Sequence, residues 1–261
     1  MEDNLKDEMI IMENIRLAAR IILENGGETF RAEDTAERMG KAMGCERVDV
    51  FALPSGVFIS FQKEGGKERT SITRIRKRSI HLGKIDLVNQ VSRQLVLGQI
   101  TPIQAKKELE DIHRKFDAKQ VKRRPYIAAL VSAAFAVLFT GNIPDLLLAA
   151  ICSMLTQWMI HLFDKHQMHQ IATNLLGGLI CTMIPLCINY FTGIGNVDII
   201  VASALMPLVP GLAMANAIQD TIREDLLSGV VHAVNALLIA ALIAGGALVG
   251  QSLFQLITGG I

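Results

Sequence analysis

Hydrophobic and polar residues separate into two halves of the chain near Pro125. Residues 1–125 carry 24 Lys and Arg against 19 Asp and Glu, whereas residues 126–261 carry 2 against 6 and read as a series of apolar runs. A helix needs about 20 mostly apolar residues to cross a bilayer core. The pattern therefore predicts a soluble domain at residues 1–120 and a membrane domain at residues 121–261.

The membrane half contains five apolar runs separated by short polar joints. The first run is short and the fifth is long enough to tilt across a bilayer. Gly246 and Gly250 in the fifth run form a small-xxx-small pattern, which is typical of close contact between helices. We expect transmembrane helices at about residues 126–140, 145–163, 171–191, 198–217 and 229–256.

The soluble half changes its hydrophobic period along the chain. Helical spacing comes first, alternation typical of strands follows, and helical spacing returns before the basic stretch. Thr101 and Pro102 have the residue types of a helix N-cap and first helical position. The predicted elements are helices at Ile10–Leu23 and Ala32–Met43, strands at Arg47–Leu53, Val57–Gln62 and Arg69–Ile75, and helices at Ile85–Leu97 and Ile103–Phe116. The fold class is thus an α+β cytoplasmic domain followed by an all-α polytopic membrane domain of about five transmembrane helices.

Basic residues in the short joints predict the orientation. Lys122, Arg123 and Arg124 precede the first run, Lys165 lies in the second joint, and Arg223 lies in the fourth. Because basic residues are retained on the cytoplasmic side, the N-terminal domain is expected in the cytoplasm and the C-terminus outside.

A multi-pass location in the membrane that bounds the cytoplasm fits this pattern, and the N-terminus shows no signal-peptide pattern. The basic stretch before the first run suits anionic lipid headgroups. A nucleic-acid site would need interleaved aromatic residues, and only Phe116 is near. We therefore expect a lipid membrane as partner and no nucleic acid.

The fourth run contains the residues Pro207, Pro210 and Gly211. Two prolines and a glycine remove backbone hydrogen bonds and break a helix. At membrane depth, such breaks are tolerated where protein or water satisfies the freed groups, and they form substrate sites in many secondary transporters. A plain kink for helix packing is the alternative.

Two polar pairs accompany this break. Asn216 and Asp220 are four residues apart and share one helix face, where they are candidates for binding substrate or a proton. The alternative for Asp220 is an ion pair with Arg223 in water. His232 and Asn235 in the fifth run are candidates for the same site, or for an ordinary polar contact between helices.

In the soluble half, the candidate residues are Glu28, Thr29 and Arg31. A carboxylate beside a base could serve acid–base chemistry. Alternatively, Thr29 caps a helix whose positive end favours Glu28. No nucleophile–histidine set lies near them and no phosphate-binding loop appears, so no catalytic residue, metal or cofactor is predicted.

Taken in order, several short motifs resemble the threonine/serine exporter family, and the resemblance covers nearly the whole chain. Each motif alone is weak, but the ordered set before five apolar runs is more specific. The motifs are Gly26-Gly27-Glu28-Thr29-Phe30-Arg31, Leu53-Pro54-Ser55-Gly56-Val57, Arg74, Thr101-Pro102, Leu208-Val209-Pro210-Gly211, Asn216 and Asp220.

The resemblance implies a secondary exporter of small polar metabolites from the bacterial cytoplasm, driven by the proton motive force. It also implies a location in the bacterial plasma (inner) membrane. Members that look like this export threonine and serine, and some split-type members are linked to dicarboxylates such as succinate. Full-length relatives carry a second membrane half, whereas this sequence ends at Ile261. A second small membrane protein and an oligomeric assembly are therefore expected. A membrane-anchored hydrolase, or a regulatory module in the soluble domain, is the alternative function.

Overall fold

The computed structural model describes residues 2–76, 79–114, 118–166 and 168–259. The chain forms two compact units, which are described separately here. The first unit comprises residues 1–116 together with Leu212–Val234, and the second comprises residues 117–211 together with 235–261. The sequence pattern did not predict that a segment of the apolar half would pack with the N-terminal residues.

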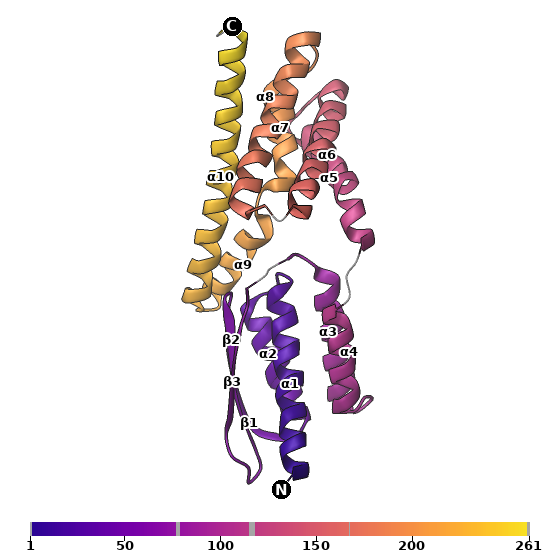
Figure 1. Ribbon diagram of the computed structural model, residues 1–261, viewed down its shortest axis with the longest axis vertical. Helices are drawn as coiled ribbons and strands as arrows, with labels where there is room; N and C mark the ends of the chain where they lie inside the picture. Colours follow the sequence, from indigo (N-terminus) through magenta and orange to yellow (C-terminus); the bar gives the residue numbers. More distant parts are fainter. Residues whose placement is uncertain (1, 77–78, 115–117, 167, 260–261) are drawn as a thin grey trace. The chain divides into compact units, whose positions relative to one another are not determined.

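The N-terminal part of the first unit is a layered α+β structure. A three-stranded antiparallel sheet in the order β1-β2-β3 lies on one side, α1 and α2 lie in the middle, and α3 and α4 lie on the far side (Figure 1). The elements are α1 Glu2–Glu24, α2 Thr29–Ala42, β1 Cys45–Leu53, β2 Gly56–Lys63, β3 Arg69–Arg74, α3 Leu82–Val96 and α4 Pro102–Arg114.

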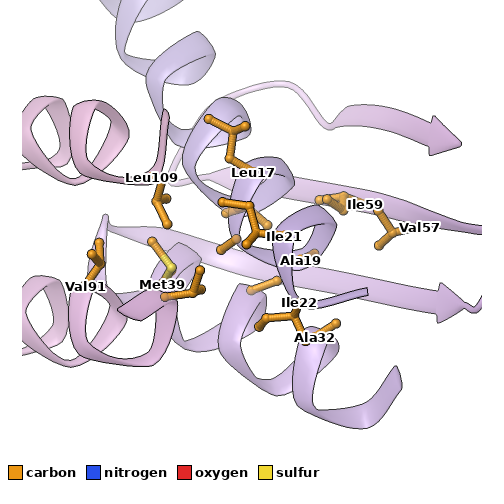
Figure 2. Close-up of a cluster of buried hydrophobic side chains, with 14 of the residues drawn as sticks. Leu17, Ala19, Ile21, Ile22, Ala32, Met39, Val57, Ile59, Val91 and Leu109 are labelled. Atoms are coloured by element: carbon orange, nitrogen blue, oxygen red, sulfur yellow. The ribbon is translucent and has the colours of Figure 1, made fainter. Parts of the chain in front are cut away.

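The core of the first unit lies between these layers. Alternate residues of β2, including Val57, Ile59 and Phe61, are buried and face the helices. Ile21 of α1, Met39 of α2, Ile59 of β2, Val91 of α3 and Leu109 of α4 belong to one buried cluster, and Figure 2 shows their side chains. Burying such side chains contributes about 1.5–3 kcal/mol each, which makes this cluster the main stabilising feature of the unit.

The predicted elements of the soluble half are present, with small shifts at their ends. The largest difference is in α1, which begins at Glu2 rather than near Ile10. Thr101 Oγ1 accepts from Gln104 N, and the Gln104 carboxamide accepts from Thr101 N, which confirms the predicted start of α4. Gly26 ends the α1 region with a φ of +85°, a left-handed conformation that a glycine adopts without a Cβ clash.

The described part of the apolar half consists of helices joined by short non-helical segments. Its elements are α5 Ala118–Leu138, α6 Ile143–Lys165, α7 Gln170–Thr192, α8 Val197–Leu205, the 3-10 turn η1 Met206–Leu208, α9 Gly211–Ile222 and α10 Leu226–Thr258. Their positions follow the five predicted apolar runs.

In the described chain, α6, α7 and α10 are long and apolar enough to cross a membrane. A fourth span is counted if Val197–Leu208 and Gly211–Ile222, which bend where they meet, form one span. Helix α5 is not among them, and its first turns carry Lys122, Arg123 and Arg124. A crossing by α5, and with it the count of five, stays a prediction.

Within the second unit, α5, α6, α7 and α8 pack side by side (Figure 1). Small residues such as Ala149, Cys152 and Ala204 are buried at their contacts. Helix α7 also meets α10 closely, because a Cβ on Gly246 would overlap the carbonyl of Leu175. This close approach confirms the contact predicted from the small-residue pattern.

Asp145 connects the N-terminal ends of α6 and α8 in the second unit. Its Oδ2 accepts from Asn142 N at 2.9 Å before α6, and its Oδ1 accepts from Asn196 N at 2.6 Å before α8. The carboxylate is almost fully buried. One side chain therefore satisfies backbone donors at the N-terminal ends of two helices.

Candidate functional site

Two candidate groups that the sequence presents far apart lie together in the first unit. One is the Glu28–Arg31 run at the start of α2. The other is formed by Asp220 in α9, Asp225 in the turn after α9, and His232 in α10. The resulting cluster of polar groups is called the Thr29 site below, because Thr29 contacts both acids.

Thr29 is the first residue of α2 and is fully buried. Glu28 is the N-cap, and no side chain caps this helix end. The interpretation of Thr29 as a helix cap is therefore wrong. Its hydroxyl instead lies 3.0 Å from Asp220 Oδ1 and 3.1 Å from Asp225 Oδ2.

When Asp220 and Asp225 are both ionised, the site has too few hydrogen-bond donors for the two carboxylates. A threonine hydroxyl has one proton, so it donates fully to one carboxylate at a time. Asp220 is 1% exposed, and its Oδ2 has no hydrogen-bond partner among the described residues. His232 Nε2 lies 3.7 Å from that oxygen. A proton added to either acid would relieve the repulsion between them and supply the missing donor.

Asn216 occupies the helix face predicted for it, one turn before Asp220. Its Nδ2 donates to the carbonyl of Gly26 at 3.2 Å. Gly26 also lies against Leu212, since a Cβ there would come within 3.1 Å of Leu212 Cδ2. The Gly26-Gly27 turn thus lets the α1–α2 junction approach α9 closely.

The solvent side of this cluster is an open cavity of about 390 Å³. Arg223 lies flat on Phe30, with its guanidinium carbon 3.5 Å from the ring centroid. Arg31 Nε donates to Glu28 Oε2 at 2.5 Å. The expected alternative was an ion pair between Asp220 and Arg223. In the structure, Arg223 instead stacks on Phe30, and Asp220 contacts Thr29 and His232. The cavity is lined by Glu28, Phe30, Arg31, Gln219, Ile222 and Arg223.

Glu33 lies one turn along α2 from Thr29. Burial raises the pKa of Glu33, the hydrogen bond from Ala52 N opposes that rise, and the charges of Asp225, Glu37 and Asp220 add to it. The carboxylate accepts from Ala52 N at 2.7 Å. Glu33 therefore holds a proton more readily than an isolated carboxylate does.

The sequence did not single out Phe30, Glu33 or Asp225. Phe30 lies between the candidate site residues Thr29 and Arg31, and Asp225 is five residues after the candidate Asp220. Both are therefore close in sequence to residues that were predicted. No periodicity connects residue 29 with residue 225, because their contact is tertiary. A further functional residue of this kind is found only when the fold is known.

The remaining predicted site residues lie in the second unit. Met206–Leu208 is a 3-10 turn and Val209 is extended, so the helix is interrupted between α8 and α9 as Pro207, Pro210 and Gly211 predicted. Asn235 is exposed on α10. Within the first unit, the structure brings His232 to Asp220. Among the described residues, no group of three or more His, Cys, Asp or Glu side chains could hold a metal ion.

Apolar helices of membrane-spanning length, joined to a layered polar domain, define an integral membrane protein. The family model described as "Putative threonine/serine exporter" matches residues 14–254, and the chain belongs to this family of transport proteins.

Two curated relatives are similar to the chain over most of their lengths. Both are named "Probable succinate transporter subunit YjjP". The one from Klebsiella aerogenes is 20% identical over 217 residues, which is 81% of each chain. The one from Escherichia coli K12 is 22% identical over 231 residues, which is 86% of this chain and 87% of the relative. No solved structure matches the chain significantly.

Proposed function

We propose that the protein is one subunit of a proton-coupled secondary exporter of small polar metabolites, either threonine and serine or a dicarboxylate such as succinate. The family membership and the two relatives support transport and a subunit role. The observation that carries the proposal for the site is the contact of the Thr29 hydroxyl with both Asp220 and Asp225.

In this proposal, Asp220 is the proton carrier. It is buried, it faces a second carboxylate through one shared hydroxyl, and it has His232 nearby. A carboxylate in such surroundings alternates between a protonated and an ionised form at modest cost, which a proton-coupled transporter requires. Asn216 binds the α1–α2 junction to the same helix, so a change at Asp220 acts on the start of α2.

The interrupted helix α8–η1–α9 is the proposed path for the solute. Breaks of this kind expose backbone donors and acceptors that can bind polar groups within a membrane. Pro207, Pro210 and Gly211 shape the break, and α9 leads from it to Asn216 and Asp220 along one helix. Asn235 is proposed as a polar residue of the same path on α10.

The proposed orientation puts the first unit in the cytoplasm and the C-terminus outside, in the inner membrane of a bacterium. Lys122–Arg124, Lys165 and Arg223 support it through the positive-inside rule. Two reporter fusions test this orientation. A protein that fluoresces only in the cytoplasm is fused to the N-terminus, and alkaline phosphatase, which is active only outside the cytoplasm, is fused to the C-terminus. Fluorescence at the N-terminus and phosphatase activity at the C-terminus are expected.

A second small membrane protein is the proposed partner, since both relatives are named as subunits. Affinity purification of the tagged chain from its native host in mild detergent should recover a polytopic protein at a fixed ratio. Recovery of the chain alone would contradict the split assembly.

The transport role is tested by efflux from the native host after deletion of the chromosomal copy. Cells complemented with the unchanged chain should release preloaded threonine, serine or succinate faster than the deletion strain. Asp220→Asn should abolish the gain, and Asp198→Asn, which alters an exposed acid in the first turn of α8, should preserve it. Equal efflux of all three solutes with and without the chain would refute the exporter function. Unchanged efflux in Asp220→Asn at equal expression would refute the role of Asp220.

A further inference from the structure

We infer that the cavity beside Phe30 binds the carboxylate group of the transported solute, with Arg223 as its main contact. The inference rests on the proposed function for the identity of the solute. It assigns the recognition step to residues at the start of α2 and at the end of α9, including Arg223 directly after α9. It concerns different groups from the proton carrier, because Asp220 and Asp225 are not among the residues that line the cavity.

The first argument concerns the hydrogen-bond donors of Arg223. A guanidinium has five N–H donors in one plane. Stacking on Phe30 at 3.5 Å uses the face of that plane and leaves its edges open. No ion pair or hydrogen bond of the Arg223 side chain to another described residue is found, and the side chain is exposed. The group is thus fixed by the ring and still has its donors for a ligand.

The second argument concerns Arg31 and Glu28. The ion pair between them uses Nε of Arg31. The two terminal nitrogens extend beyond that contact, and 43% of the Arg31 side chain is exposed. Both guanidinium carbons lie within 6.0 Å of the Phe30 centroid. Two partly free guanidinium groups therefore border one small cavity, a geometry that suits planar carboxylates.

The third argument is the balance of charge and polarity in the lining. Glu28 offsets the charge of Arg31, so the charge of Arg223 is left over within the lining set. Phe30 and Ile222 add apolar surface, and Gln219 adds an amide. A volume of about 390 Å³ lies at the small end of ligand pockets. The site accordingly fits a solute of a few carbons with an acidic group.

The cavity and the Thr29 site are adjacent in sequence and space. Thr29 and Phe30 are consecutive residues, and Arg223 is three residues after Asp220. A proton taken up by Asp220, the proposed carrier, removes a negative charge close to the cavity. Carboxylate binding at Arg223 is then favoured, which links recognition of the solute to the proton.

The test is direct binding to the purified full-length protein, measured by isothermal titration calorimetry with succinate, L-threonine and the neutral diamide succinamide. At least one of the two carboxylates should bind, and succinamide should bind at least 10-fold more weakly. Binding of succinate alone supports contact with both guanidinium groups. Binding of threonine alone supports contact of its ammonium group with Glu28.

The variants separate recognition from folding. Arg223→Gln should weaken carboxylate binding by at least 10-fold, and Arg223→Lys should recover part of it, since it keeps the charge without the planar fork. Arg93→Gln, an exposed change at the end of α3, should bind as the unchanged chain does. Thermal unfolding of each variant verifies that it is folded.

Equal binding by Arg223→Gln, equal binding of succinamide, or no carboxylate binding by the unchanged chain would overturn the inference. The two proposals fail separately. Arg223-dependent binding without efflux supports the site and refutes the exporter function. Efflux without Arg223-dependent binding refutes the site and leaves the exporter function in place.

Discussion

The hydroxyl of Thr29 lies 3.0 Å from Oδ1 of Asp220, across 191 positions of sequence. Thr29 begins a helix of the N-terminal layered structure, and Asp220 is near the end of α9 in the apolar half. One buried hydrogen bond thus joins the two halves of the sequence within the first unit. Since Asp225 lies 3.1 Å from the same hydroxyl, two negative groups depend on one donor.

Thr29→Val should lower the stability of the folded protein. Valine has nearly the same shape, but it cannot donate, so the carboxylates of Asp220 and Asp225 would face each other without a hydrogen bond between them. Loss of a buried donor costs about 1–3 kcal/mol. The expected result is a lower thermal unfolding midpoint of the purified protein at neutral pH.

Thr29→Ser is the matched control, because serine keeps the hydroxyl and removes one methyl group. It should retain most of the hydrogen bonding and most of the efflux activity. If valine and serine were equally stable and equally active, the hydroxyl would have no role in the Thr29 site.

Glu33→Gln should change the pH dependence of stability. Burial raises the folded-state pKa of Glu33 above its usual value of 4.5. The folded state therefore holds this proton more tightly than the unfolded state, and its contribution to stability is lost as the pH rises from 4.5 through the folded pKa. Glutamine keeps an oxygen that accepts from Ala52 N and does not ionise.

The measurement for Glu33 is thermal unfolding between pH 4 and pH 8. Glu33→Gln should be at least as stable as the unchanged chain at pH 8, with a smaller fall in stability as the pH rises. Asp34→Asn, on the exposed face of the same helix, should leave the pH profile unchanged. A steeper fall in Glu33→Gln would contradict the direction of the pKa shift.

The elements of the fold were predictable because each has a local cause. The alternation of apolar and polar residues in Val57–Gln62 follows from a sheet that is buried on one face. The start of α4 is set locally by two adjacent residues, Thr101 and Pro102. The break near Pro207 and Pro210 was predictable for the same reason, since proline cannot continue a helix. These features need no knowledge of distant residues.

The composition of the Thr29 site was only partly predictable. Asp220 and Asn216 were chosen from their place near a broken helix, and Thr29 from a short motif. The contacts between these segments were not predicted, because a hydrogen bond between residues 190 positions apart leaves no periodic pattern in the sequence. Thr29 has the residue type of a helix cap, and the tertiary contact with the two acids prevailed over that local role.

Asp145→Asn should destabilise the second unit. The carboxylate accepts from both Asn142 N and Asn196 N. An asparagine amide offers one oxygen and one nitrogen, so one of the two N–H groups loses its acceptor, at a cost of about 1–3 kcal/mol. The thermal unfolding midpoint should fall, while Asp198→Asn in the first turn of α8 should have little effect. Equal midpoints would mean that the two loops are held together by other contacts.

Adjacent glycines in α10 provide the sharpest packing test. A Cβ on Gly246 would overlap the Leu175 carbonyl and lie 2.9 Å from its carbon, whereas a Cβ on Gly245 would meet nothing within 4 Å. Gly246→Ala must therefore push α7 and α10 apart and should cost about 1–3 kcal/mol, as overpacking does. Gly245→Ala should be neutral or slightly stabilising, since alanine favours the helix. Thermal unfolding of the two variants in one detergent compares them directly. If both lost stability equally, the cause would be glycine flexibility in the helix rather than the approach of α7.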